Sequence, residues 1–169
     1  MGTNTTEQQV PTQAEPQREH EWLRRLVGDW TFEAEAIEPG KPPQRATGTE
    51  SVRTLNGLWY VAEGQGEMPG GGPATTIMTL GYDPARERYV GTWIGSMMTH
   101  MWIYEGVIAD NGTLELSSEG PSFDGSDRLG RYRDVIEFRS DDHRLLTSHV
   151  LGSDGEWQQF MTAHYRRLK

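Results

Sequence analysis

The hydrophobic positions of this chain recur with two different spacings. Near the N-terminus, the segment "EPQREHEWLRRLVGDW" has apolar residues at helical spacing with charged residues between them. These apolar residues are Trp22, Leu23, Leu26 and Val27. The pattern predicts one short amphipathic helix, for which Pro16 fits the first turn and Gly28 fits the end.

Beyond Gly28 the pattern changes to short segments rich in β-branched and aromatic residues, separated by Gly, Pro, Asn and Asp. Such segments predict strands, and the breaks carry turn chemistry, as in "LNG", "ADNG" and "GSDG". The predicted strands are 30–38, 46–55, 58–67, 74–82, 87–95, 99–109, 113–119, 131–139, 144–151 and 156–166.

Short loops between successive strands imply antiparallel neighbours, and about ten such strands avoid open edges by closing into a barrel. We therefore predict an all-β protein, an antiparallel up-and-down barrel of about ten strands with one short N-terminal helix. A barrel of this size has an interior wider than its own side chains fill, so we expect a cavity.

Length and composition limit the domain organisation. The 169 residues suit one domain, and only 34% of them are hydrophobic. The first residues, "MGTNTTEQQVPTQAEPQ", contain a single large aliphatic side chain, Val10. They cannot bury enough apolar surface to offset their ordering entropy. We predict a disordered tail over 1–15 and a single barrel domain over 16–169.

Charge and residue usage exclude several function classes. The formal charge of −9 repels phosphate backbones, so we expect no nucleic-acid partner. The chain has no cysteine, which excludes disulfides and thiolate sites. It also lacks a signal-peptide pattern and an apolar run able to span a bilayer, so we expect a cytoplasmic protein without a membrane partner.

Two short motifs mark the start and the end of the predicted barrel. "GDW" at Gly28–Trp30 opens the first strand, and "HYRR" closes the last. Together with the helix they resemble the pattern of the calycin superfamily, which includes lipocalins. In calycins the tryptophan plugs the barrel base and an arginine of the last strand packs over it. The resemblance implies this role for Trp30, with Arg166 as its arginine and Arg167 as the alternative.

Three longer blocks cover most of the chain after about residue 19. They are "HEWLRRLVGDW", "GYDPARERYVGTWIGSMMTHMWIYEG" and "YRDVIEFRSDDHRLLTSHVLGSDGEWQQFMTAHYRR". These blocks are similar to the bacterial DUF1579 family. The family name records an unknown function. The resemblance therefore implies a lipocalin-like barrel and no particular chemistry.

The segment "GTWIGSMMTHMWIYEG", residues 91–106, predicts a hairpin with "SMMT" as its turn. Gly95 would then pair with His100, Trp93 with Trp102, and Gly91 with Tyr104. Strand alternation separates an aromatic face from an aliphatic one. The aromatic face has Tyr89, Gly91, Trp93, Gly95, His100, Trp102, Tyr104 and Gly106, and the aliphatic face has Val90, Thr92, Ile94, Met101, Ile103, Glu105 and Val107.

We favour the aromatic face as the inner one. Glycines opposite bulky rings leave space, and the polar tips of Trp and Tyr suit a cavity wall with few polar groups. The aliphatic face would then lie outside, under the helix or in a homodimer contact. Met97 and Met98 would form an adaptable apolar rim. The competing interpretation is that these aromatic pairs only stabilise the sheet.

The function that this pattern favours is binding of a small apolar or aromatic molecule, without a cofactor or a metal. The predicted ligand-binding residues are Trp93, His100, Trp102 and Tyr104, with Tyr60 and Met78 from neighbouring strands. Three alternatives stay open. The same pocket could serve a cofactor-free isomerase, cyclase or lyase in which His100 or Tyr104 moves a proton. A single histidine could hold a haem, although none of the five shows a metal-binding spacing. The outer face around Ile94 and Ile103 could bind another protein.

Overall fold

The computed structural model describes residues 12–68 and 71–169. It contains one helix followed by ten strands, all in the predicted order. They are α1 (Arg18–Arg24), β1 (Gly28–Ala36), β2 (Gln44–Leu55), β3 (Trp59–Glu67), β4 (Pro73–Asp83), β5 (Arg88–Gly95), β6 (Trp102–Ile108), β7 (Leu114–Pro121), β8 (Leu129–Ser140), β9 (His143–Leu151) and β10 (Trp157–Arg167). Most of the tail predicted over 1–15 lies outside the described residues, and residues 12–15 are in neither helix nor strand.

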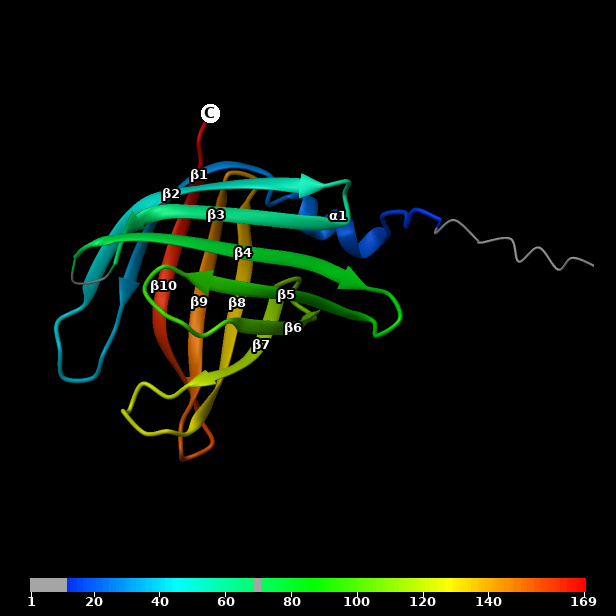
Figure 1. The fold of residues 1–169 in the computed structure, drawn as a ribbon. Helices are drawn as coiled ribbons and strands as arrows, with labels where there is room; N and C mark the ends of the chain where they lie inside the picture. The colour runs from blue at the N-terminus through cyan, green and yellow to red at the C-terminus, as the bar shows by residue number, and fades with distance from the viewer. Residues whose placement is uncertain (1–11, 69–70) are drawn as a thin grey trace, which may run out of the picture.

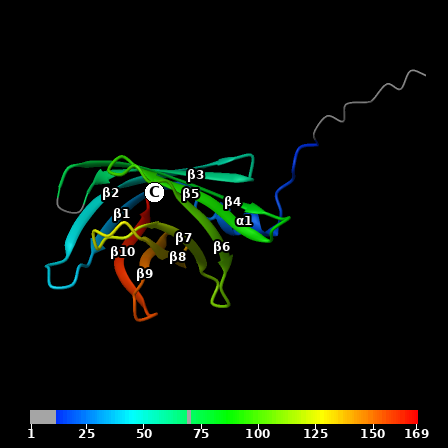
Figure 2. The ribbon, with the colours of Figure 1, turned by 60° about the horizontal axis from the view of Figure 1, so that its bottom comes forward.

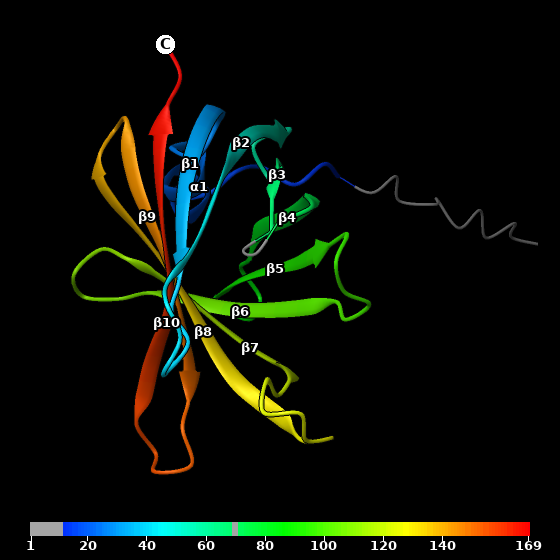
Figure 3. The same cartoon turned by 90° about the vertical axis from the view of Figure 1, so that its left-hand side faces the viewer.

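The ten strands form a closed antiparallel barrel, as predicted. Each strand pairs with its neighbours in sequence, and β10 pairs with β1 to complete the ring. Figures 1 and 3 show these first and last strands side by side, and Figure 2 shows the strands curving around the interior. Closure gives each of the ten described strands a hydrogen-bonded neighbour on both sides, which explains how so many short strands form one stable sheet.

The connection between β5 and β6 is longer than predicted. Strand β6 begins at Trp102, whereas the sequence predicted a strand from residue 99. The pairing of β5 with β6 ends at Trp93 and Trp102, whereas Gly95 pairs with Thr76 of β4. Ser96 continues along β4, because its backbone N–H donates to the Thr75 carbonyl at 2.8 Å and its hydroxyl accepts from the Thr75 N–H at 2.9 Å. The predicted pair of Gly95 with His100 is therefore wrong. The predicted pair of Trp93 with Trp102 is confirmed.

Helix α1 closes one end of the barrel. Its seven residues are too few for a stable isolated helix, so it depends on packing against the barrel. Leu23 is fully buried there, and two barrel tyrosines bond the helix backbone. The hydroxyl of Tyr60 donates to the His20 carbonyl at 3.3 Å, and that of Tyr89 donates to the Glu19 carbonyl at 2.9 Å.

The helix does not cover the aliphatic face of the β5–β6 hairpin. The sequence analysis had placed this face either under the helix or in a homodimer contact. Helix α1 packs against β4 and the barrel end instead. Ile94, Met101, Ile103 and Val107 stay exposed on the outer surface. A homodimer through this face stays a prediction.

At the base of the barrel, Trp30 is fully buried, but its arginine is not the one preferred from the sequence. Arg167 lies over the Trp30 ring at 4.2 Å and donates to the Val27 carbonyl at 2.6 Å. Arg166 is exposed. Strand register explains this correction, because Arg167 pairs with Trp30, and successive side chains alternate between the two faces. Gly28 has a φ of +135°, and a Cβ there would lie 2.5 Å from the Arg167 Nη1.

Candidate ligand-binding cavity

The aromatic face of the β5–β6 hairpin points into the barrel, which confirms the predicted orientation. Trp102 is only 8% exposed and Tyr104 is buried, whereas Ile103 between them is 65% exposed. Strand alternation thus separates the two faces as the sequence predicted. The glycines leave room for the rings: a Cβ on Gly120 of β7 would lie 2.2 Å from the Trp102 ring.

A cavity of about 610 Å³ occupies the barrel interior on the side of these rings. We call it the outer cavity. Its lining is mainly apolar and includes eight aromatic residues, with methionine, alanine and glycine between the rings. The aromatic residues are Phe32, Trp93, Trp102, Tyr104, Phe123, Tyr132, Phe160 and Tyr165. Its lining includes Met68, Met97 and Phe123 from the β3–β4, β5–β6 and β7–β8 connections, so it reaches the end opposite α1.

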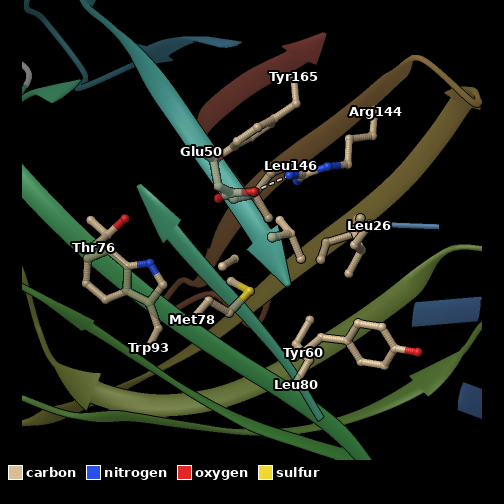
Figure 4. A pocket seen from close by; sticks show the side chains of 13 residues that line it. Leu26, Glu50, Tyr60, Thr76, Met78, Leu80, Trp93, Arg144, Leu146 and Tyr165 are labelled. Atoms are coloured by element: carbon tan, nitrogen blue, oxygen red, sulfur yellow. Dashed lines mark hydrogen bonds and ion pairs between the residues drawn. The ribbon is translucent and has the colours of Figure 1, made fainter. Parts of the chain in front are cut away.

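A second, smaller cavity of about 40 Å³ lies nearer the helix, and we call it the inner cavity (Figure 4). Leu26, Leu80 and Ile136 close it on the side of the barrel base. The two cavities have six lining residues in common, Glu50, Thr76, Met78, Trp93, Leu146 and Tyr165. The two spaces are therefore adjacent parts of one barrel interior.

Four of the predicted ligand-binding residues line the outer cavity. Trp102 and Tyr104 form part of its wall, and Trp93 and Met78 lie where the two cavities meet. Tyr60 lines only the inner cavity, and its hydroxyl points away toward the helix (Figure 4). Tyr60 is thus part of the helix anchor at the closed end.

The structure corrects the placement of His100, which lines neither cavity. It lies in the β5–β6 connection, with its Nε2 3.1 Å from the Glu119 carbonyl oxygen. Its ring packs edge-on against the outside of the Trp102 wall, with 4.9 Å between the centroids. Met98 does line the cavity, and its sulfur accepts a hydrogen bond from the Trp102 indole N–H at 3.1 Å.

The sequence analysis missed a carboxyl group in the wall of the outer cavity. Asp134 of β8 accepts a hydrogen bond from the Tyr104 hydroxyl at 2.5 Å, and the Ser148 side chain also bonds it. Burial raises the pKa of Asp134, although both hydroxyl groups oppose the shift. Burial, followed by the charge of Asp134, holds the pKa of Tyr104 well above its ordinary value. Tyr104 therefore stays protonated and acts as the donor.

A second buried carboxyl, Glu50, lies where the cavities meet and is paired with Arg144. The side chains of Arg144 and Glu50 are only 4% and 12% exposed. The guanidinium also lies over two rings, 3.9 Å from the Tyr165 centroid and 4.6 Å from that of Trp30. Figure 4 shows the pair spanning the interior beside Tyr165. This ion pair leaves Glu50 electrically compensated within the protein.

Comparison with known proteins places the chain in a family. A family model described as "Protein of unknown function (DUF1579)" matches residues 15–167. The chain belongs to the DUF1579 family. A comparison with curated proteins finds no match.

Solved structures share the fold of this DUF1579 protein. The S-type phycobiliprotein lyase CPES from Guillardia theta is 15% identical, with a TM-score of 0.57 over 88% of this chain and 92% of that chain. Rv2717c from M. tuberculosis is 12% identical, with a TM-score of 0.60 over 92% and 100% of the two chains. At these identities the likeness shows the barrel fold alone.

The haem alternative does not fit the cavity of the DUF1579 barrel. Of the residues that the structure describes, no histidine lines either cavity. His149 bonds the Arg133 carbonyl, and His143 and His164 stack on each other at the surface. Residues 12–68 and 71–169 bring together no group of three metal-ligating side chains.

No helix in those ranges is both long and apolar enough to cross a membrane.

Proposed function

We propose that this protein binds a small, largely apolar aromatic molecule in the outer cavity. The observation that carries the proposal is the cavity volume of about 610 Å³ behind a wall of aromatic side chains. Pockets for small molecules span about 300–1,000 Å³ and have mostly apolar walls with few polar groups. Protein cores are otherwise packed with few voids larger than a water molecule. Packing alone would therefore not leave such a volume inside the barrel.

The lining favours a flat ligand. Trp93 is partly accessible from the interior and lies where the two cavities meet. Aromatic rings attract other rings through offset or edge-on contacts. At the open end, Met97 and Met98 supply flexible side chains that adapt to different shapes.

A second candidate function, a cofactor-free isomerase, cyclase or lyase, is favoured by one observation. Tyr104 and Asp134 share a 2.5 Å hydrogen bond in the cavity wall, and burial raises the pKa of both groups. A carboxyl group in a cavity wall with a raised pKa is a candidate for proton exchange with a bound molecule. His100 cannot share this role because it lies outside the cavity.

The test of the binding proposal uses 1-aminoanthracene, a neutral three-ring fluorescent amine. Titration into the protein is expected to enhance its emission, with energy transfer from the cavity tryptophans, at one molecule per chain. Trp93→Ala should weaken binding about tenfold, since it removes a ring from the wall.

Ile94→Ala is the matched control, because Ile94 is the next residue on β5 and points to the outer surface. Its affinity should equal that of the wild type. Equal losses in the two variants, or no saturable binding in the wild type, would place the site elsewhere and refute the proposal.

A further inference from the structure

The charge of the outer-cavity wall limits the kind of ligand it suits. Of its described lining residues, three carry carboxyl groups, Glu50, Glu67 and Asp134. No lysine, arginine or histidine is found in the same described lining. Glu50 is compensated by Arg144, and Glu67 is exposed to solvent near the open end. Asp134 is thus a buried carboxyl group in this wall without an ion-pair partner in the described structure.

The groups around Asp134 leave room for one more partner. Tyr104 from β6 and Ser148 from β9 each donate one hydrogen bond, while a carboxylate can accept about four. His149 is the neighbouring basic group, but it pairs with Arg133 on the strand position next to Ser148. Successive strand residues point to opposite faces, so His149 lies on the outer side of the sheet. It therefore occupies none of the space on the cavity side of Asp134.

The rest of the cavity also favours a positive charge. Trp93, Trp102 and Tyr132 present rings to the interior, and the negative face of an aromatic ring attracts cations. The whole chain has a formal charge of −9, which draws cations toward the protein before they bind. An anionic ligand would be repelled by the carboxyl groups of the wall, by the negative faces of the rings and by the net charge of the chain.

We propose that the ligand of the outer cavity is a planar aromatic cation, a protonated amine, amidine or nitrogen heterocycle, whose charged N–H group binds the Asp134 carboxylate. This inference rests on the proposed binding function and specifies its ligand class. Tyr104 and Ser148 orient the carboxylate from behind, and the aromatic wall holds the ligand ring. The ligand supplies the positive charge that the cavity wall lacks.

The experiment compares three probes of the same three-ring size. They are 9-aminoacridine, a cation at neutral pH; 1-aminoanthracene, which is neutral; and anthracene-9-carboxylate, an anion. Affinities are measured by fluorescence titration in high salt, which screens long-range attraction but not a buried contact. The wild type should bind the cation most tightly and the anion most weakly.

Asp134→Asn then tests the position of the charge. It should weaken binding of 9-aminoacridine about thirtyfold, the effect of removing one partner of a buried charged pair. The loss of affinity for the neutral 1-aminoanthracene should be much smaller than the loss for the cation, and an unchanged far-UV circular dichroism spectrum shows that the variant is folded. Glu63→Gln is the matched control, since it removes the same charge from an exposed position of β3 that lines neither cavity, and it should change neither affinity more than about twofold.

The outcomes separate this inference from the proposed function. Saturable binding of the neutral probe with no preference for the cation, or a cation affinity that Asp134→Asn leaves unchanged, overturns the inference and keeps the binding function. Absence of binding by all three probes overturns both. The probe comparison in the wild type decides the ligand charge even if Asp134→Asn does not fold.

Discussion

Replacing Arg144 by methionine tests whether the buried ion pair is part of the barrel's stability. The change keeps an unbranched apolar stem but leaves Glu50, whose side chain is 12% exposed, without its cation. It also removes the guanidinium from the rings of Trp30 and Tyr165, which lie 4.6 Å and 3.9 Å away. We expect Arg144→Met to be one of the most destabilising single changes in this chain.

The magnitude follows from what each variant leaves buried. Removing one partner of a buried pair costs about 3–5 kcal/mol, chiefly because the other charge stays uncompensated. For a chain of this length, 1 kcal/mol corresponds to about 2–4 °C in Tm, so the loss should be about 6–20 °C. The double variant Glu50→Gln with Arg144→Met leaves no buried charge and should recover most of the loss, because neutral packing often replaces a buried pair without cost.

Urea unfolding followed by tryptophan fluorescence measures these free energies, since Trp30 lies directly beside the pair. Arg166→Met is the control, because Arg166 is an exposed arginine on β10 and should change stability by less than about 0.5 kcal/mol. A double variant no more stable than Arg144→Met would refute the reasoning. So would a single variant that unfolds at the wild-type urea concentration.

Three further predictions concern the barrel base, the cavity wall and the buried acid. Arg167→Ala removes hydrogen bonds to three backbone carbonyls and should cost about 2–4 kcal/mol in urea unfolding, whereas Arg166→Ala should cost under about 0.5 kcal/mol. Gly120→Ala puts a Cβ 2.2 Å from the Trp102 ring, so overpacking should cost about 1–3 kcal/mol and change the near-UV circular dichroism; an unchanged spectrum and stability would contradict the close packing. Burial raises the pKa of Asp134 above its ordinary value of 3.8 in the folded protein. As the pH rises from 3.8, the unfolded chain loses this proton before the folded chain does. The free energy of unfolding therefore falls as the pH rises through the folded pKa. Asp134→Asn removes that loss and should be more stable than the wild type at pH 7, which urea midpoints from pH 4 to pH 7 would check.

Much of the barrel could be predicted because its information is local. Turn residues separate ten β-rich segments, and short connections permit only antiparallel neighbours. Within each strand of the β5–β6 hairpin, alternation separates Trp93 from Ile94 and Trp102 from Ile103, whatever the turn. That Trp93 and Trp102 share a face depended on the predicted pairing, which the structure confirms. The inward orientation of that face was inferred from the space beside its glycines and from its polar ring tips, because periodicity alone does not choose between the two faces.

Two of the corrections depend on contacts between distant parts of the chain. His100 fits the alternation of the aromatic face, but Gly95 and Ser96 follow β4 through Thr76 and Thr75, far away in the sequence, and β6 begins only at Trp102. The choice between Arg166 and Arg167 depends on the register of β10 against Trp30 in the first strand. Two adjacent arginines at a strand end carry no local signal for that register.

The polar groups of the cavity carried a signal that the sequence analysis did not use. In β8, Tyr132, Asp134, Ile136 and Phe138 alternate, so the acid lies in an otherwise apolar series with a period of two. Glu50 alternates with Val52 in the same way on β2. An acidic residue on the apolar face of a strand is therefore a marker of a buried polar group. The sequence alone could not show which of these acids has a cation partner, because the partner of Glu50 is Arg144 of β9, which is far away in the sequence.

The two buried acids have different consequences for the barrel. Glu50 is compensated by Arg144 from β9, so its charge is satisfied whether the cavity is empty or filled. Asp134 has only hydroxyl donors, so its ionisation weakens the empty barrel, and a cation from outside is what can offset the penalty. Residues that lower stability are found preferentially at functional sites, where a ligand supplies the missing interaction. On this argument, the same carboxyl group that costs the empty protein stability determines the charge of the molecule that fills it.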